Sequence, residues 1–296
     1  MKLYAGLVGL CLLASIGFSS CAQSTANHQL PTTSALSTSS TASAVDILEN
    51  TKISTEKMKI EVWSDIVCPF CYIGKRHYEK ALAETGLSDK IELVWRSFQL
   101  DPEADYDQAS KSKKSYESFA EKKGIPVAQA KQMFDQVNTM AQKAGLNYNF
   151  DIAINANTEQ AHLLLQKAKE KGLGDAMKER LLKAYFMDGK DLEHEATLIE
   201  LGKEVGLTAE EVKAALTDKT YADKLKADLK QAQEYGIGGV PFFVVDGKYG
   251  INGAQPVDVF KQTLQGAYAE WEKANADKPK LKVIDGQSCK PDGKCD

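Results

Sequence analysis

The sequence predicts an α/β protein whose mixed sheet is interrupted by a long helical block. Three observations support this class. Residues 58–100 show a strand, a helix and a second strand, residues 113–235 have the apolar spacing of helices, and residues 240–253 have the pattern of a hairpin. A strand-helix-strand unit implies a parallel pair with a right-handed crossover, and the hairpin adds antiparallel strands.

The composition is that of a soluble globular protein with ample material for a core. Of the 296 residues, 43% are hydrophobic and 26% are charged. The formal net charge is −4 at pH 7, and no basic block is present. The sequence therefore gives no indication of nucleic-acid binding.

The start of the chain, residues 1–20, is expected to be a targeting signal. Lys2 is followed by a mostly apolar run to Phe18, then by two serines and Cys21. This is the order of a secretory signal, and the run is short for a membrane-spanning helix. It resembles a bacterial lipoprotein signal, which implies that Cys21 becomes the lipidated first residue. An ordinary secretory signal is the alternative, since Phe18 stands where Leu is usual. Either signal takes the protein out of the cytoplasm and into a compartment in which disulfides can persist.

A flexible tether is expected next, over residues 21–57. Residues 24–45 contain no Asp, Glu, Lys or Arg and are dominated by Ser, Thr and Ala. Such a segment buries too little apolar surface to offset the entropy lost on ordering. We expect it to connect a membrane anchor to the folded domain.

The folded part begins with alternating apolar residues. Residues 58–67 predict a strand, residues 72–87 a helix, and residues 91–100 a second strand. Trp63 and Trp95 occupy alternating strand positions, so we expect both in the core.

The helical block and the hairpin complete the pattern. Thr208 and Glu211 have the spacing of a capping box that opens one helix of the block. Residues 240–253 contain two short strands around an Asp-Gly turn, which is a strong hairpin signal. A final amphipathic helix is expected over residues 256–274.

The six cysteines limit the possible chemistry. Cys11 lies in the signal, and Cys21 is the candidate lipid site. Four others remain, in two pairs far apart in the sequence: Cys68, Cys71, Cys289 and Cys295. A tetrahedral metal site would use all four, but the second pair lacks the short spacing of a zinc knuckle. We therefore expect no metal and no cofactor.

The first pair has the features of a redox centre. Cys68 lies between a strand and a helix, near the N-cap, where free backbone N–H groups and the helix dipole favour a thiolate. Pro69 suits the first helical position. We predict that Cys68 is the exposed, low-pKa nucleophile and that Cys71, one turn later, is the resolving thiol. A structural disulfide is the alternative, but so short a loop gains little from closure.

These motifs resemble a known family. A CxxC at a strand-to-helix turn, with GGVP before a later strand, resembles the thioredoxin superfamily, and the helical insertion resembles the DsbA family. The segments WSDIVCPFCYIGKRHYEKAL, WRSFQLDP, NTEQAHLL, AYFMDGKDL and GIGGVPFFVVDGKYGINGAQP are similar to the FrnE-like branch. That branch is related to 2-hydroxychromene-2-carboxylate isomerases and kappa-class glutathione transferases. The resemblance covers about residues 58–270.

The resemblance implies a thioredoxin fold with a mixed central sheet and an all-helical insertion domain. With the signal and tether, the expected parts are 58–112 as the first half of that fold, 113–235 as the insertion, 236–275 as the second half, and 276–296 as a tail.

The resemblance also implies roles for residues near the cysteines. Pro241 would be a cis-proline facing the CxxC, and the backbone of Val240 would pair with an extended substrate segment. From sequence alone, Pro241 could simply open an edge strand. DsbA has histidine where Phe70 stands. Because that histidine helps to stabilise the thiolate, Phe70 implies a higher pKa for Cys68 and a less oxidising disulfide, which favours exchange or isomerisation.

The helix starting near residue 157 carries two further polar candidates. Asn157 is expected to be its N-cap, with Gln160 three residues on. We expect His162 to be packed rather than catalytic. His77 lies too far along the active-site helix to be assigned a contact with Cys68.

The tail contains the second pair. Cys289 and Cys295 bracket a Pro-Asp-Gly turn that would bring their sulfurs together. The pair resembles the extra C-terminal motif of FrnE-like proteins. Our hypothesis is that it is redox-active and exchanges with the first pair; a static disulfide is the alternative.

The sequence therefore predicts a thiol-disulfide oxidoreductase or isomerase of the cell envelope, on the periplasmic side and lipid-anchored to a membrane. Its expected partners are protein thiols and disulfides, an unidentified redox partner and the membrane, and not nucleic acid. A glutathione-dependent transferase or isomerase is the alternative, although those enzymes carry serine where Cys68 stands. A non-catalytic lipoprotein is less favoured.

Overall fold

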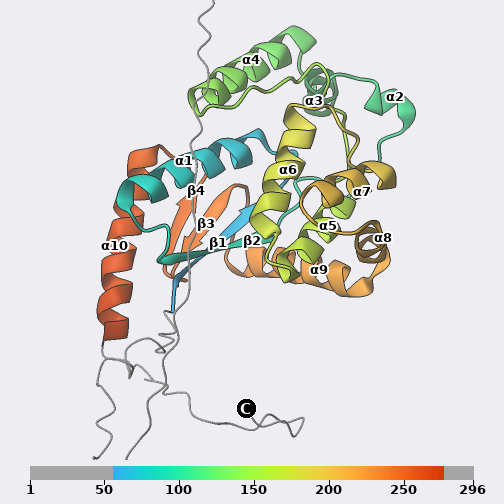
Figure 1. Ribbon diagram of the computed structural model, residues 1–296. Helices are drawn as coiled ribbons and strands as arrows, with labels where there is room; N and C mark the ends of the chain where they lie inside the picture. The colour runs from blue at the N-terminus through green and yellow to red at the C-terminus, as the bar shows by residue number, and fades with distance from the viewer. Residues whose placement is uncertain (1–55, 277–296) are drawn as a thin grey trace, which may run out of the picture. The chain divides into compact units, whose positions relative to one another are not determined.

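The computed structural model describes residues 56–276, in which a four-stranded sheet has the order β2-β1-β3-β4 (Figure 1). Its strands are β1 (Met58–Ser64), β2 (Ile91–Ser97), β3 (Phe242–Val245) and β4 (Tyr249–Asn252). β1 pairs in parallel with β2 and antiparallel with β3, and β3 pairs antiparallel with β4. The predicted mixed sheet is confirmed.

The helices fall into two groups. Two of them follow strands of the sheet and pack against each other, namely α1 (Pro69–Thr85) and α10 (Val257–Ala276). The others described lie between β2 and β3: α2 (Gln108–Lys111), α3 (Ser115–Lys123), α4 (Val127–Lys143), α5 (Glu159–Glu170), α6 (Gly174–Phe186), α7 (Glu195–Glu204), α8 (Ala209–Thr217) and α9 (Lys219–Glu234). None of the helices within residues 56–276 is both long and apolar enough to span a membrane.

The inserted helices pack against the sheet through neighbouring residues of β1 and β2. Val62 pairs with Trp95, whose indole N–H donates to Asp175 of α6 at 3.0 Å. Trp63, on the opposite face, donates to the Asp228 carbonyl of α9 at 2.9 Å. Both tryptophans are buried, as predicted.

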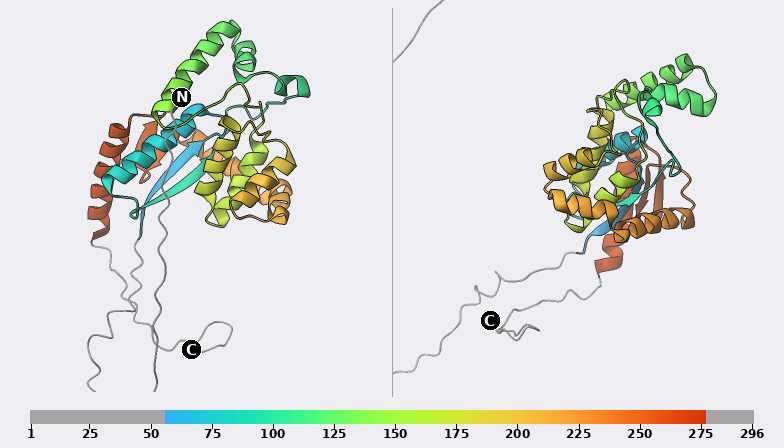
Figure 2. Two further views of the ribbon diagram at one scale, coloured as in Figure 1. Left: turned by 45° about the horizontal axis from the view of Figure 1, so that its top comes forward. Right: turned by 90° about the vertical axis from the view of Figure 1, so that its right-hand side faces the viewer.

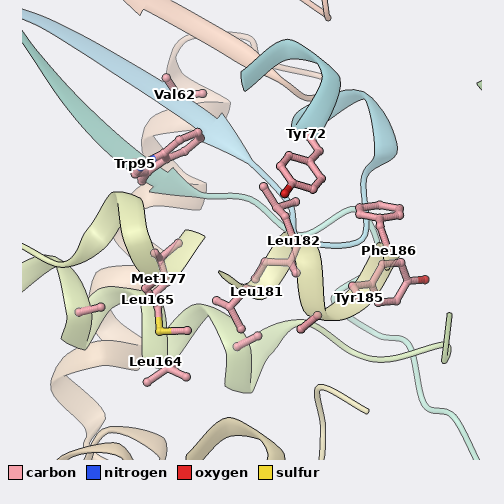
Figure 3. Close-up of a cluster of buried hydrophobic side chains, with 14 of the residues drawn as sticks. Val62, Tyr72, Trp95, Leu164, Leu165, Met177, Leu181, Leu182, Tyr185 and Phe186 are labelled. Carbon is pink, nitrogen blue, oxygen red and sulfur yellow. The ribbon is translucent and has the colours of Figure 1, made fainter. Parts of the chain in front are cut away.

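One apolar core joins the insertion to the sheet (Figure 3). Leu164 and Leu165 of α5 lie beside Met177 and Leu181 of α6, and the cluster continues to Trp95 of β2. α3 and α4 lie beyond α1 and α6, on the side away from α8 and α9 (Figures 1 and 2). They share a separate small cluster built on Tyr116, Ala120 and Ala130.

Several element boundaries differ from those expected. The second strand ends at Ser97 rather than at residue 100, because the Leu100 N–H donates to the Asp65 carboxylate instead of to a strand. The N-cap of α5 is Thr158, and Asn157 caps from one position earlier by accepting from the Glu159 N–H at 2.9 Å. The capping box that opens α8 is confirmed.

Candidate functional site

The CPFC turn lies where β1 ends and α1 begins. Cys68 is the N-cap of α1, in an extended conformation, and Pro69 opens the helix. Proline suits that position because the first helical N–H has no partner within the helix. Cys71 lies one turn on, and its backbone N–H donates to the Cys68 carbonyl at 3.0 Å.

Both thiols are free and buried. Cys68 is 4% exposed and Cys71 is 1% exposed. The prediction that Cys68 is exposed is therefore wrong, because the loop before β3 covers its side chain. The Cys68 thiol donates to the Val240 carbonyl at 3.4 Å.

The Val240–Pro241 peptide is cis, as the resemblance implies. Pro241 also packs against α1 at Gly74, where an added Cβ would lie 3.0 Å from the proline Cγ. Any larger residue at this helix position would press on the proline ring and require it to shift. The close approach brings the two halves of the fold together beside the cysteines.

A large cavity of about 1020 Å³ opens beside Cys68. It extends from the CPFC turn and the segment after β2 to α3 and α4, and its lining includes Cys68, Phe70, Leu100, Met133, Met140 and Val240. Four of these residues are large, apolar and exposed: Phe70, Leu100, Met133 and Met140. The charged residues of the lining are Asp101, Asp105, Glu121 and Lys122. Lys122 pairs with Asp101, and Glu121 pairs with Lys113, so most of the charge on these lining residues is compensated.

The opposite side of the cysteines is polar and fully buried. Asp65 accepts from the backbone N–H groups of Ile66 at 2.7 Å and Leu100 at 2.8 Å. It also lies 3.2 Å from Nε2 of His162. Burial alone would raise the pKa of Asp65, but the hydrogen bond from His162 and the other contacts hold it below its usual value. Burial lowers the pKa of His162, so its imidazole is neutral. The Nε2–H of this ring donates to the ionised carboxylate of Asp65.

A buried cation comes from the insertion. Lys178 of α6 has no exposed surface, and its ammonium donates to the Ser64 carbonyl at 3.1 Å. It also lies 5.6 Å from the centre of the Trp95 ring. Burial lowers the pKa of Lys178 to about 8.

The surroundings shift the pKa values of the two cysteines in opposite directions. The hydrogen bond to Cys71, and then burial, raise the pKa of Cys68. Burial would also raise the pKa of Cys71, but the hydrogen bond from Cys68, the charge of Lys178 and the Ser64 hydroxyl lower it. These directions are opposite to the expected low pKa of Cys68. The hydrogen bond from the Cys68 thiol to the Val240 carbonyl also favours the protonated form of Cys68, because only the thiol can donate.

An aromatic stack fixes the turn from the side of the insertion. Tyr148, between α4 and α5, donates to the Pro69 carbonyl at 2.8 Å. Its ring stacks on Phe186 with a centroid distance of 4.5 Å and on Tyr72 at 6.1 Å. The position of the CPFC turn thus depends on residues far along the chain.

The structure brings together Cys68, Cys71, Pro69, Phe70, Val240 and Pro241, all of which the sequence indicated. It also brings His162 to the site, where its Nε2 lies 3.2 Å from the carboxylate of Asp65. His77 instead binds the Gln255 carbonyl at 2.8 Å. Cys21, Cys289 and Cys295 lie outside the described residues.

Sequence reasoning missed Asp65, Lys178 and Tyr148. Asp65 follows directly after a buried strand, and a carboxylate there is a signal that could have been noticed. Lys178 stands in a helix rich in Lys, Glu and Leu, where a lysine normally faces solvent. No local pattern identifies it as buried.

Comparison with known proteins agrees with this geometry. Residues 59–265 match the family model of the DSBA-like thioredoxin domain. The uncharacterized protein YwbO of Bacillus subtilis (strain 168) is 30% identical over 209 residues, covering 69% of this chain and 94% of that protein. A crystal structure of a probable DsbA oxidoreductase from Streptomyces coelicolor is 38% identical, with a TM-score of 0.67, covering 81% of this chain and 98% of that one.

A more distant structure, that of a 2-hydroxychromene-2-carboxylate isomerase, shares the fold. It is 15% identical with a TM-score of 0.52, and the match covers 75% of this chain and all of that one, 100%. The predicted thioredoxin fold with its helical insertion is confirmed by these matches and by the topology. The family match covers more than half of the chain, so the protein belongs to the family of DSBA-like thioredoxin domains.

Proposed function

We propose that the protein is a thiol-disulfide oxidoreductase or isomerase that acts at Cys68 and Cys71 through a mixed disulfide. One observation carries this proposal: a pair of free thiols at a helix N-terminus, with only Cys68 of the two lining the large cavity. The substrate reaches Cys68, and Cys71 stays behind it. Neither a metal nor an organic cofactor is needed for this exchange.

The first step consumes a substrate disulfide. Cys68 loses its proton to water and attacks one substrate sulfur as a thiolate, and the substrate disulfide breaks. One substrate sulfur is now bonded to Cys68, and the other leaves as a thiolate. The cavity mouth and the Val240 backbone hold the substrate segment during this step.

The second step releases the substrate. Cys71 gives its proton to the departing substrate thiolate and attacks Cys68, so that the mixed disulfide breaks as the Cys68–Cys71 disulfide forms. The substrate has gained two electrons, and the pair has lost two. A dithiol partner returns the pair to its reduced form. The same steps in reverse oxidise a substrate dithiol.

The cavity favours protein substrates with apolar segments. Its exposed Met133 and Met140 have flexible side chains that can adapt to different apolar partners. We therefore assign unfolded or partly folded proteins with exposed cysteines as the substrate class.

Two substitutions test the mechanism. Cys68→Ala is expected to abolish reduction of insulin disulfides, because the nucleophile is lost. Cys71→Ala is expected to accumulate mixed disulfides with substrates, which can be trapped by acid and identified by mass spectrometry. If the two variants lose activity equally and neither traps a substrate, the assigned roles are wrong.

A glutathione-dependent transferase or isomerase is the alternative outcome. It would show turnover with glutathione and a small electrophile that survives Cys71→Ala and forms no disulfide. Turnover of insulin with only a dithiol present, and none with glutathione and electrophile, supports the oxidoreductase.

The location is a separate proposal. We propose that the protein is anchored on the periplasmic side of a membrane through a lipid on Cys21, supported by the apolar run that ends just before this residue. Cys21→Ala is expected to abolish fatty-acid labelling and to move the protein from the membrane to the soluble fraction. Unchanged labelling would overturn the lipid anchor and leave the secretory signal.

The tail pair is proposed to exchange disulfides with the CPFC pair. Its support is the short turn between Cys289 and Cys295, since exposed short-loop disulfides tend to be labile. A variant with both Cys71→Ala and Cys295→Ala, mildly oxidised, is expected to form a Cys68–Cys289 cross-link. Absence of this cross-link, with full activity after removal of residues 286–296, would make the tail pair a static disulfide.

A further inference from the structure

Five methionines lie in the described part of the chain, and they differ in exposure. Met58 and Met177 have no exposed surface, and Met187 is half-buried against the main core. Met133 is 41% exposed and Met140 is 44% exposed. Both belong to α4, and both line the large cavity. The exposed methionines of the described residues therefore lie where the substrate is proposed to bind.

The spacing of these two methionines places them on one face of α4. Their positions in the sequence differ by about two helical turns. Val137, which lies between them in the sequence, lines the same cavity. The two side chains remain exposed, so neither is required to fill the interior of the protein. This face of α4 presents two thioether side chains to solvent and to whatever enters the cavity.

The cysteines of the site are less accessible to a dissolved oxidant than these methionines. Cys68 is 4% exposed and Cys71 is 1% exposed. An oxidant must reach the sulfur that it oxidises, so exposure favours the methionines. Once Cys68 and Cys71 have formed their disulfide, neither keeps a thiol that can react. An oxidant in excess then meets Met133 and Met140.

Oxidation changes the chemical character of a methionine without breaking its carbon chain. A lone pair of the thioether sulfur attacks one oxygen of hydrogen peroxide, the O–O bond breaks, and the other oxygen leaves as hydroxide. A proton passes from the sulfur-bound OH to that hydroxide, which gives a sulfoxide and water. The sulfur has lost two electrons, and the peroxide has gained them. A flexible apolar side chain has become a polar, chiral one.

Two sulfoxides in the cavity lining would weaken the binding of an apolar segment. Covering a sulfoxide oxygen with apolar groups, without a hydrogen-bond donor, costs free energy. Phe70 and Leu100, the other large exposed apolar residues of the lining, contain no sulfur and keep their character. The Cys68 thiol is held by the Val240 carbonyl rather than by α4, so the thiol chemistry itself is expected to continue.

We propose that Met133 and Met140 form a modification site at which peroxides lower the affinity of the cavity for apolar polypeptide segments. The inference rests on the proposed function, since it concerns the surface that receives the substrate. An oxidant that drives the CPFC pair to its disulfide also makes this surface polar, so an excess of oxidant limits the disulfides that the protein can introduce. A methionine sulfoxide reductase reverses the change.

The first measurement locates the oxidation. The full chain, with its cysteines held as disulfides, is treated with hydrogen peroxide, and catalase ends the reaction. Peptide mass spectrometry follows the gain of one oxygen atom at each methionine. Met133 and Met140 are expected to be oxidised at least about tenfold faster than the buried Met58 and Met177. Equal rates at all four would overturn the site.

The second measurement follows binding without any thiol chemistry. The probe is a fluorescein-labelled peptide of Leu, Phe and Ser that contains no cysteine, and its Kd is measured by fluorescence anisotropy. Peroxide treatment is expected to raise this Kd about tenfold, because two sulfoxide oxygens would be covered without donors. Oxidation of dithiothreitol by the same sample is expected to be unchanged, since so small a dithiol needs no apolar surface.

Two variants provide the controls. Met133→Leu combined with Met140→Leu keeps apolar side chains of similar size and removes both sulfurs. After peroxide treatment, its Kd should equal that of its own untreated sample. Met187→Leu removes the half-buried methionine, which does not line the cavity, and should show the same rise as the unaltered protein. Methionine sulfoxide reductases A and B should restore the Kd of the unaltered protein.

The outcomes separate the inference from the function on which it rests. Sulfoxides at Met133 and Met140 with an unchanged Kd would overturn the effect on binding, and so would an untreated protein that does not bind the peptide. An equal rise in the double leucine variant would assign the loss to other damage. If the untreated protein turns over neither insulin nor dithiothreitol, the proposed function is wrong, whereas oxygen mapping and anisotropy still decide the role of the two methionines.

Discussion

The two sides of Cys68 are built in opposite ways. On one side, Asp65, His162 and Lys178 are buried and hydrogen-bonded to fixed partners. On the other side, the cavity is lined by exposed apolar residues such as Met133 and Met140. In the proposed function, the buried side surrounds the thiols with fixed polar groups, whereas the exposed methionines offer substrates a surface that can adapt.

The two sides also differ in the hydrophobic cluster that each packs against. The polar side lies within the main core, which joins the sheet to α5 and α6. The cavity wall formed by α3 and α4 is built on a small cluster around Tyr116, Ala120 and Ala130, and α4 contributes only Ala141 to the buried residues of the main core. Few buried contacts imply a low free energy of local opening. We therefore expect the α3–α4 pair to open more readily than the base of the site.

The largest effect is expected from removing one aromatic ring from the main core and, for comparison, one from the α3–α4 wall. Phe186 is fully buried and stacks on Tyr148, so Phe186→Ala should lower the free energy of unfolding by about 3–5 kcal/mol. Phe134 of α4 is only half-buried, with its nearest ring at 4.8 Å, so Phe134→Ala should cost less. Urea unfolding gives both values. Equal losses would break the distinction between a rigid base and a looser wall.

A second, smaller effect is the response of the polar side to acid. Burial keeps His162 neutral, so below pH 6.5, its ordinary pKa, the unfolded chain binds a proton that the folded chain does not. Stability should therefore fall as pH falls from 6.5 toward the lowered pKa of the folded state. His162→Gln should flatten this part of the profile, measured as melting temperature against pH. A variant profile with the original slope would show that other groups carry the acid response.

The smallest effect is expected on the apolar side. Replacing Met133 and Met140 by alanine removes part of the surface offered to substrates. We expect KM for a reduced, unfolded protein to rise about fivefold, for about 1 kcal/mol of lost apolar contact, with little change for a small disulfide. Val127→Ala is the matched control, because Val127 is exposed on the same helix and does not line the cavity. An equal rise in the control would remove the special role of the methionines.

Much of the fold was predictable because its signals are local. The alternation of β1, the Asp-Gly turn of the hairpin and the proline after Cys68 each act over a few residues. The end of β2 was misplaced, since residues 98–100 are as apolar as the strand and only the long-range contact between Leu100 and Asp65 ends the pairing.

The candidate site was predictable in part for the same reason. The cysteines and Val240–Pro241 are recognisable as short motifs. The opposite pKa shifts of the two thiols were not, because they arise from the contact between two buried sulfurs and from groups such as Lys178, which is 107 residues after Cys71 by sequence number. The burial of Cys68 depends likewise on a loop that follows the whole insertion. Charges and contacts that arise only on packing leave no trace in a local pattern.

The central position of β1 has a consequence for the newborn chain. Its partners β2 and β3 come from opposite ends of the described sequence, and the loop covering Cys68 directly precedes β3. While the chain is being made, the ribosome must add residues 242–245 before β1 gains its second neighbour. Until then Cys68 and Cys71 lack their cover and are open to any oxidant or stray thiol. The enzyme proposed to pair the cysteines of other proteins is thus itself exposed to mispairing until nearly all of its fold has been synthesised.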